Sequence, residues 1–217
     1  MNALEFSNRL FENKPEGSQV QIVELPSRKA TNFDSIEEAA KYVEGLDLNS
    51  NVYYACCVQS GSSAKNQPRS YETACGINMF WADIDIGDHG NGKPYAPDLE
   101  SVLSIIDEFP LKPSLIVFTG HGVHVYWLFR EPWIFSDQKE KAQAEEWCKR
   151  LQATLRGFAA KKGCTIDATH DLARILRVPG TFNNKPGMPR AKVEVLVENS
   201  FRYDPADFDP GSCILLS

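Results

Sequence analysis

The stretch from Ile77 to Asp85 limits the possible folds more than any other part of this 217-residue chain. Apolar residues dominate from Ile77 to Ala82 and predict a strand buried in a sheet. Asp83 and Asp85 end this strand two positions apart, so both side chains point to the same face. Carboxylates that share a face repel each other and lose hydration unless a cation offsets the cost. A hard divalent cation such as Mg²⁺ prefers such oxygen ligands; the alternative is a strand end with two solvated acids.

The composition is that of a globular chain that can build its own core. The length fits one large or two small domains, and 42% of the residues are hydrophobic. No apolar run reaches the length of a membrane span, and the first residues do not have the pattern of a signal peptide. The six cysteines include no CxxC pair and no histidine at zinc-site spacing, so we expect a reduced, cytoplasmic protein with free thiols.

The charge is distributed unevenly along the chain. The net charge of -6 argues weakly against nucleic acid as a partner. The segment from Lys161 to Lys192, however, contains seven Lys and Arg against two Asp, a local charge of +5. The segment after Lys192 is acidic. This contrast predicts a site for a polyanion on the basic segment.

Hydrophobic periodicity predicts a mixture of helices and strands. The expected helices cover 3–13, 35–44, 97–108 and 137–162. The expected strands cover 18–25, 51–59, 77–85, 114–119, 123–129 and 191–198, with a strand-like piece at 164–167 and a helical turn at 171–178. Residues 60–70 and 181–190 are expected to be loops. Because there are more strands than a helix bundle would contain, the fold class is α/β or α+β.

A hairpin with glycines in its turn carries a histidine on its second strand. The turn Gly120-His121-Gly122 joins the two strands, and its glycines allow a ligand to approach the backbone closely. His124 follows, although a single strand histidine is more often a structural hydrogen-bonding residue than a ligand contact. We expect Trp81, Tyr126 and Trp127 in the core rather than as platforms on which bases stack.

Basic residues gather after a third acidic position. Arg174, Arg177 and Lys185 follow Asp167 around a Pro-Gly-Thr turn. Guanidinium groups bind phosphate oxygens in pairs, and lysine adds a compact charge, so this set suits a triphosphate. Taken alone, a few cations near a loop indicate only a solvated surface.

In this order, the acidic strand, the hairpin and the basic segment resemble the archaeo-eukaryotic primase superfamily, in the form found in replication proteins of phages and plasmids. The resemblance runs from residue 51 to residue 185. The stretches that carry it are Phe80-Trp-Ala-Asp-Ile-Asp85, Thr119-Gly-His-Gly-Val-His-Val-Tyr-Trp127, Ile166-Asp167 and Asp171-Leu-Ala-Arg-Ile-Leu-Arg-Val-Pro-Gly-Thr-Phe-Asn-Asn-Lys185. The Asp-x-Asp pair alone is a weak signal, whereas all these motifs in order are specific.

The resemblance implies roles for individual residues. The catalytic set would be Asp83, Asp85, Asp167 and His124, with the three acids holding two Mg²⁺ or Mn²⁺ ions. Asp171 is the alternative third ligand. The residues implied to bind the nucleotide are Gly122, His124, Arg174, Arg177, Asn183 and Lys185, with Thr119 as a weaker match. Many members carry a serine where this chain has Gly122, so any contact there would come from the backbone. Lys65 and Arg69, in the loop before the acidic strand, are weaker matches for holding template phosphates.

The resemblance also implies a fold and an activity. The fold is one domain over 1–217, with a sheet of the RNA-recognition-motif type, antiparallel or mixed, at 51–200, a small α/β unit at 1–50 packed on it, and an acidic tail at 201–217. The activity is template-dependent nucleotidyl transfer, as a DNA primase, a DNA polymerase or both, in the replication of a phage, plasmid or mobile element. The partners would be dNTPs or NTPs, a primer and single-stranded DNA. No GxxxxGK[ST] motif is present, so a helicase would be a separate domain or protein.

Three other functions share part of this pattern. A DxD glycosyltransferase binds a nucleotide diphosphate through Mn²⁺ after a hydrophobic strand, but it needs neither the histidine hairpin nor the basic residues. An HUH-type nicking endonuclease needs two histidines around one apolar residue, whereas His121 and His124 are separated by two residues. A non-catalytic nucleic-acid-binding module keeps the sheet but has no need of three carboxylates or a divalent cation.

Overall fold

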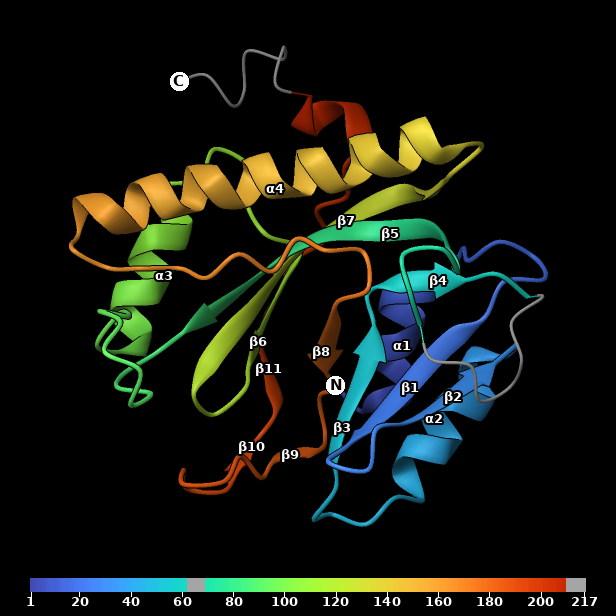
Figure 1. The fold of residues 1–217 in the computed structure, drawn as a ribbon, viewed down its shortest axis with the longest axis horizontal. Coiled ribbons are helices and arrows are strands. Elements are labelled where there is room, and N and C mark those ends of the chain that lie inside the picture. Colours follow the sequence, from blue (N-terminus) through green and yellow to red (C-terminus); the bar gives the residue numbers. More distant parts are fainter. Residues whose placement is uncertain (62–68, 210–217) are drawn as a thin grey trace.

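Two larger antiparallel sheets, a two-stranded antiparallel sheet and four α-helices make up the protein in a computed structural model that describes residues 1–61 and 69–209 (Figure 1). The helices are α1 (Ala3–Phe11), α2 (Ile36–Glu44), α3 (Leu99–Asp107) and α4 (Gln138–Lys161), with a 3-10 helix η1 (Pro205–Phe208). The strands are β1 (Val20–Leu25), β2 (Lys29–Phe33), β3 (Asn51–Ala55), β4 (Cys57–Gln59), β5 (Ala74–Asp85), β6 (Leu115–Phe118), β7 (Gly122–Ile134), β8 (Ile175–Arg177), β9 (Phe182–Asn183), β10 (Ala191–Lys192) and β11 (Glu194–Glu198). Lys65 lies outside the described residues.

The larger sheet has the order β11-β6-β7-β5-β4 and confirms the mixed fold class predicted from the sequence. Its long central strands β5 and β7 pair so that Asp83 lies opposite His124 and Asp85 lies opposite Gly122. Trp81, Tyr126 and Trp127 are fully buried, as expected for core residues, and α4 runs across this sheet (Figure 1). The long hydrophobic pairing of β5 with β7 therefore holds the acidic end of β5 in a fixed register.

The smaller sheet has the order β2-β1-β3-β8 and combines strands from distant parts of the chain. Helices α1 and α2 pack on each other and on this part of the molecule (Figure 1). Phe6 of α1 makes edge contacts with Tyr54 of the smaller sheet and with Tyr126 of the larger sheet, at ring-centroid distances of 5.6 and 6.1 Å. One aromatic side chain thus links the two sheets through a shared core.

The chain passes from one sheet to the other at Cys56. The sequence predicts one strand over 51–59, but β3 ends at Ala55 in the smaller sheet and β4 begins at Cys57 in the larger one. The Cys56 N–H donates to the Arg174 carbonyl at 2.9 Å, which satisfies the backbone at the break. This crossing places β3 and β8 beside the end of β5.

Three other expectations for local structure were wrong. Residues 171–178 contain the strand β8 instead of a helical turn, because Tyr53 of β3 offers backbone partners opposite Arg177. The segment 164–167 is not a strand, so Asp167 does not end one as Asp85 does. Strands β2 and β9 lie where no strand was expected, and the strand predicted over 191–198 is divided between β10 and β11.

Two expectations about composition hold for the described residues. None of the helices is both long and apolar enough to cross a membrane. The described cysteines are all free thiols: Cys56, Cys57, Cys75, Cys148 and Cys164.

Candidate active site

A pocket of about 700 Å³ opens between the acidic end of β5 and the smaller sheet. It brings together residues from three separate stretches of the chain that the sequence singles out. Of the predicted site residues, Asp83, Asp85, Thr119, His124, Arg177, Asn183 and Lys185 line it. The β1–β2 turn, which includes Arg28, forms part of the opposite rim.

The two acids of β5 carry charge that the described residues do not neutralise. The Asp83 and Asp85 side chains are about one-third exposed, at 32% and 33%. Burial raises the pKa of Asp83 to about 6, even though the positive charges of Arg174 and Arg177 oppose the shift. Burial, and then the negative charge of Asp83, raise the pKa of Asp85 as well. Binding of a cation would stabilise a carboxylate pair in this state.

His124 lies beside the acids as a neutral imidazole. Its Nε2 is 3.6 Å from Asp83 Oδ1, and its side chain is 5% exposed. Burial and the charges of Arg177 and Arg174 lower the pKa of His124 to about 3, so the ring is uncharged at neutral pH. Its Nδ1 is buried and has no hydrogen-bond partner within the described residues. A buried ring nitrogen without a partner is uncommon in a folded protein, and here it belongs to a residue that lines the pocket.

Arg177 is held in place by two residues of β3 that the sequence did not indicate. Its Nη1 donates to Asn51 Oδ1 at 2.8 Å, and its guanidinium stacks on the Tyr53 ring at 4.6 Å. Asn51 Oδ1 also accepts from the Asn184 N–H at 2.8 Å. A planar guanidinium fixed in this way presents its free donors in one direction, as bidentate phosphate binding requires.

Asn183 and Lys185 lie at the end of the same segment. The Asn183 side-chain amide donates to the Thr119 carbonyl at 2.8 Å, and its oxygen accepts from the Lys185 N–H at 3.2 Å. Lys185 Nζ lies 3.0 Å from Nδ1 of His89. His89 also lines the pocket, although it was not among the site residues predicted from the sequence. The hairpin of β6 and β7 is thus bonded to the basic segment directly.

Gly122 has a packing role on β7 and does not line the pocket. A Cβ at this position would lie 2.5 Å from the Ile84 carbonyl oxygen and 3.2 Å from the Asp85 Cα. The serine that many superfamily members carry at this point therefore has no room here. Glycine allows β7 to approach the acidic end of β5 closely.

The third acid is engaged by other protein groups. Lys93 Nζ lies 2.6 Å from Asp167 Oδ1, and the Tyr95 hydroxyl donates to Asp167 Oδ2 at 2.9 Å. These bonds lower the pKa of Asp167. Its charge still contributes to the raised pKa values of Asp83 and Asp85, so the three acids share one electrostatic environment.

The alternative third acid, Asp171, pairs with Arg174 at 2.6 Å. Among the described residues, no three His, Cys, Asp or Glu side chains are arranged to hold a metal ion. Asp83 and Asp85 nevertheless fit a Mg²⁺ site, because this ion is often held by one or two carboxylates together with substrate phosphates. A second ion needs Asp167, whose two oxygens are taken up by Lys93 and Tyr95.

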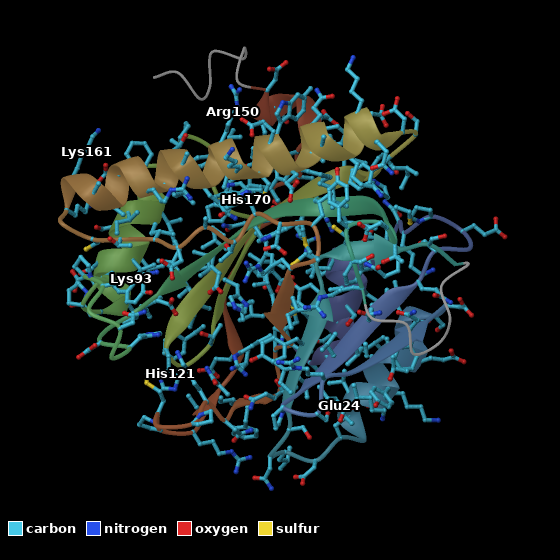
Figure 2. All side chains as sticks on the ribbon, viewed as in Figure 1. Glu24, Lys93, His121, Arg150, Lys161 and His170 are labelled. Atoms are coloured by element: carbon cyan, nitrogen blue, oxygen red, sulfur yellow. The ribbon has the colours of Figure 1, made fainter. Side chains whose placement is uncertain are left out.

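The other basic residues are more scattered than the sequence indicates. Arg69 Nε donates to the Ala173 carbonyl at 2.6 Å and so supports the segment that leads into β8. Lys162 pairs with Glu108 at 2.8 Å, and Lys161 lies at the end of α4, far from His121 and the β6–β7 turn (Figure 2). The local charge of +5 is therefore not one surface.

The residues that the sequence did not reveal share one property: their partners are distant in the chain. Asn51 and Arg177, for example, are separated by 126 positions, and no periodicity connects them. His89 had a weak signal, since it follows the acids within a glycine-rich stretch.

Comparison with known proteins finds similar structures but no similar sequences. The sequence matches no protein-family model and no curated protein. The fold is similar to the AEP domain of the primase-polymerase of cyanophage S-2L, with a TM-score of 0.60 and 16% identity over 95% of this chain and 94% of that one. The catalytic domain of primase RepB′ in complex with initiator DNA gives 0.48 and 13% identity, over 91% of this chain and 86% of that one. Another structure of primase RepB′ gives a TM-score of 0.49 and 14% identity, over 91% of this chain and 57% of that one. The similarity to the cyanophage domain shows that the chain has the fold of a primase-polymerase AEP domain.

Proposed function

We propose that this protein transfers nucleotides from nucleoside triphosphates to a primer, or to a new chain, on a single-stranded DNA template. One observation carries the proposal: a single pocket joins two unneutralised carboxylates, Asp83 and Asp85, to the fixed cations Arg177 and Lys185. A nucleoside triphosphate with its divalent cation complements both halves of this pocket. The similarity to the fold of a phage primase-polymerase domain supports the same reaction class.

The residues of the pocket suit the charge changes of this reaction. A 3′-hydroxyl attacks the α-phosphorus, the bond to the β-phosphate breaks, and pyrophosphate leaves with the negative charge. Arg177 and Lys185 would neutralise that charge, and the neutral ring of His124 would donate one hydrogen bond to a phosphate oxygen. Asp83 and Asp85 would hold a divalent cation, which would supply the positive charge that makes the attacking hydroxyl more acidic and offsets the phosphate charge. Asp167 is the carboxylate that would hold a second ion.

The rim of the pocket offers a path for DNA. Arg28, on the β1–β2 turn, lines the pocket, and Arg190 and Lys192 lie beside and on β10, in the same segment as the lining residues Asn183 and Lys185. All three are exposed, and Arg190 stacks on the Phe182 ring at 3.9 Å. Cations in this position would bind template or primer phosphates without reading sequence.

The test is extension of a labelled primer on single-stranded DNA, with dNTPs or NTPs and Mg²⁺ or Mn²⁺. We expect extension that depends on the template and the divalent ion. The variant Asp83→Asn/Asp85→Asn should be slower by about a thousandfold, since several kcal/mol of charge stabilisation is lost. The matched control is Asp107→Asn, which removes an exposed acid of α3 that pairs with Lys112.

Two outcomes would reject the proposal. Equal extension by the wild type and the double variant would show that these acids do not carry the chemistry. DNA binding without any extension, and without a need for a divalent ion, would instead indicate a non-catalytic binding module. A parallel reaction without primer separates initiation from elongation.

A further inference from the structure

The loop that follows the acidic strand contributes one residue, His89, to the lining of the pocket. Residues 86–96 leave β5 directly after Asp85 and return to the same place, where the Gly87 N–H donates to the Ala96 carbonyl at 2.8 Å. His89 lies in this loop, lines the pocket, and has a side chain that is only 5% exposed. None of the motifs that carry the superfamily resemblance includes this residue.

The surroundings of the His89 ring determine which nitrogen carries the proton. Nε2 lies 3.0 Å from the Ile86 carbonyl and 3.2 Å from the His121 carbonyl, and both carbonyls can only accept. Nε2 must therefore be the donor. On the other side of the ring, Nδ1 lies 3.0 Å from Lys185 Nζ, and an ammonium group can only donate. With its proton on Nε2, the ring directs the Nδ1 lone pair at the Lys185 ammonium.

This contact gives a flexible lysine a fixed position. Lys185 is exposed and has four rotatable bonds. Without the His89 contact, a ligand that binds its ammonium would have to order the side chain, and the lost rotamer entropy would weaken binding. The ammonium has three N–H donors, and the bond to His89 uses one of them. The other two remain for ligand oxygens. His89 Nδ1 is also 3.5 Å from Asp85 Oδ1, so the ring lies between the acid pair and the lysine.

We propose that His89 is a positioning residue for the triphosphate: Nε2–H fixes the ring to the backbone of the two neighbouring turns, and Nδ1 holds the Lys185 ammonium where phosphate oxygens bind. The inference rests on the proposed function, because a nucleoside triphosphate is the ligand that Lys185 would serve. His89 acts through Lys185 and takes no part in bond making.

Two substitutions divide the roles of the two nitrogens. The amide atoms of Asn are as many bonds from the backbone as Nδ1 of His, and the amide atoms of Gln are as many bonds from it as Nε2. His89→Gln therefore keeps the anchor to the carbonyls but removes the acceptor for Lys185. His89→Asn keeps an acceptor for Lys185 but removes the anchor. The remote histidine of the segment below α4 supplies the control, His170→Gln (Figure 2).

The experiment measures dNTP KM, kcat and the thermal unfolding midpoint in primer extension by each variant. We expect His89→Gln to raise the dNTP KM roughly tenfold, with kcat changed by less than about twofold and the unfolding midpoint near the wild type, since one hydrogen bond to a charged group is lost. His89→Asn should show a KM near the wild type and a lower unfolding midpoint. Adding His89→Gln to Lys185→Ala should raise KM no further than Lys185→Ala alone, because the two residues act through one contact.

The opposite pattern overturns the inference. A wild-type KM in His89→Gln, or full additivity with Lys185→Ala, would show that His89 only supports the loop. His170→Gln should leave KM unchanged, so a KM effect there as large as in His89→Gln would also contradict a specific role for His89.

A second readout does not depend on activity. Nitrogen chemical shifts of the imidazole rings, measured by NMR in this chain with four histidines, report the tautomer of each ring. We expect His89 to carry its proton on Nε2, and its Nδ1 shift to move in Lys185→Ala. A proton on Nδ1 would overturn the contact. A wild type that neither extends primers nor binds dNTPs would refute the proposed function, whereas the tautomer would still decide whether His89 holds Lys185.

Discussion

At the level of single residues, burial makes the negative charges of Asp83 and Asp85 energetically unfavourable. The raised pKa of Asp83, about 6 against 3.8 for a free side chain, means that the folded state binds more protons than the unfolded state between these two values. The free energy of unfolding contributed by this residue therefore falls as the pH rises from about 4 to about 6, and stays low above that range. Sites that bind cations commonly carry such a cost.

The first prediction is that Asp83→Asn stabilises the metal-free protein at pH 7. The gain should be about 1 kcal/mol, a value reduced from the full pKa shift because one-third of the side chain is exposed. Urea unfolding at pH 7 and about pH 3 measures it, and the difference between variant and wild type should largely vanish at the lower pH, where Asp83 is mostly protonated in both states. A variant less stable than the wild type at pH 7 would contradict this view of the site.

The second prediction concerns the shape of the cation at position 177. Arg177→Lys keeps the charge but loses the bond to Asn51, the stacking on Tyr53 and the planar fork. We expect the dNTP KM to rise roughly tenfold, since about one to two charged hydrogen bonds are lost. Steady-state primer extension measures this, with Arg150→Lys on the exposed side of α4 as the control (Figure 2). An unchanged KM would mean that charge alone matters at position 177.

At the scale of elements, the register of β5 on β7 decides where the acids lie. Asp83 faces His124 and Asp85 faces Gly122, so a shift of one position would turn both acids to the other face of the sheet. The close approach at Gly122 is part of this register, because no larger residue fits against the Ile84 carbonyl.

The third prediction is therefore that Gly122→Ser does not restore the pattern common in the superfamily but damages the site. The new Cβ would meet the β5 backbone, which should destabilise the fold by about 1–3 kcal/mol, as overpacking does elsewhere. Thermal unfolding and primer extension measure the two effects. The matched control is Gly157→Ser, because a Cβ on that helical glycine of α4 meets nothing within 4 Å. Wild-type stability and activity in Gly122→Ser would show that β7 can move away from β5.

The sequence predicted those elements whose signal is local. The apolar run before Asp83, the hairpin around His121 and the periodic stripe of α4 each lie within one segment, and each was found. Strand β8 was not, because three residues become a strand only when β3 offers a partner. The support of Arg177 by Asn51 was hidden for the same reason.

At the scale of the whole molecule, the pocket exists because the chain changes sheets at Cys56. This crossing sets β3 and β8 beside the end of β5, and the basic segment after β8 then faces the acids. In this arrangement Lys161, at the end of α4, lies far from His121 of the β6–β7 turn, which lines the pocket (Figure 2). The net charge of -6 describes the whole chain, so it does not argue against DNA binding by the cations beside the pocket.

The fourth prediction is that single-stranded DNA binds to the rim of the pocket. Affinity should fall with a slope of about -2 in a plot of log K against log salt, as expected for about three phosphate contacts. The variant Arg28→Ala/Arg190→Ala/Lys192→Ala should bind weakly and lose most of that slope in a fluorescence anisotropy titration. The control Lys161→Ala/Lys162→Ala removes cations at the far end of α4 and should bind as the wild type does. Equal weakening by both variants would point to non-specific attraction.

Whether Asp83 and Asp85 hold a metal ion against a triphosphate is best decided by a crystal structure with Mn²⁺ and a non-hydrolysable dNTP. We predict an anomalous manganese peak between the carboxylates of Asp83 and Asp85, with the triphosphate against Arg177 and Lys185. Manganese bound elsewhere, or a nucleotide whose phosphates lie away from these four residues, would contradict the account.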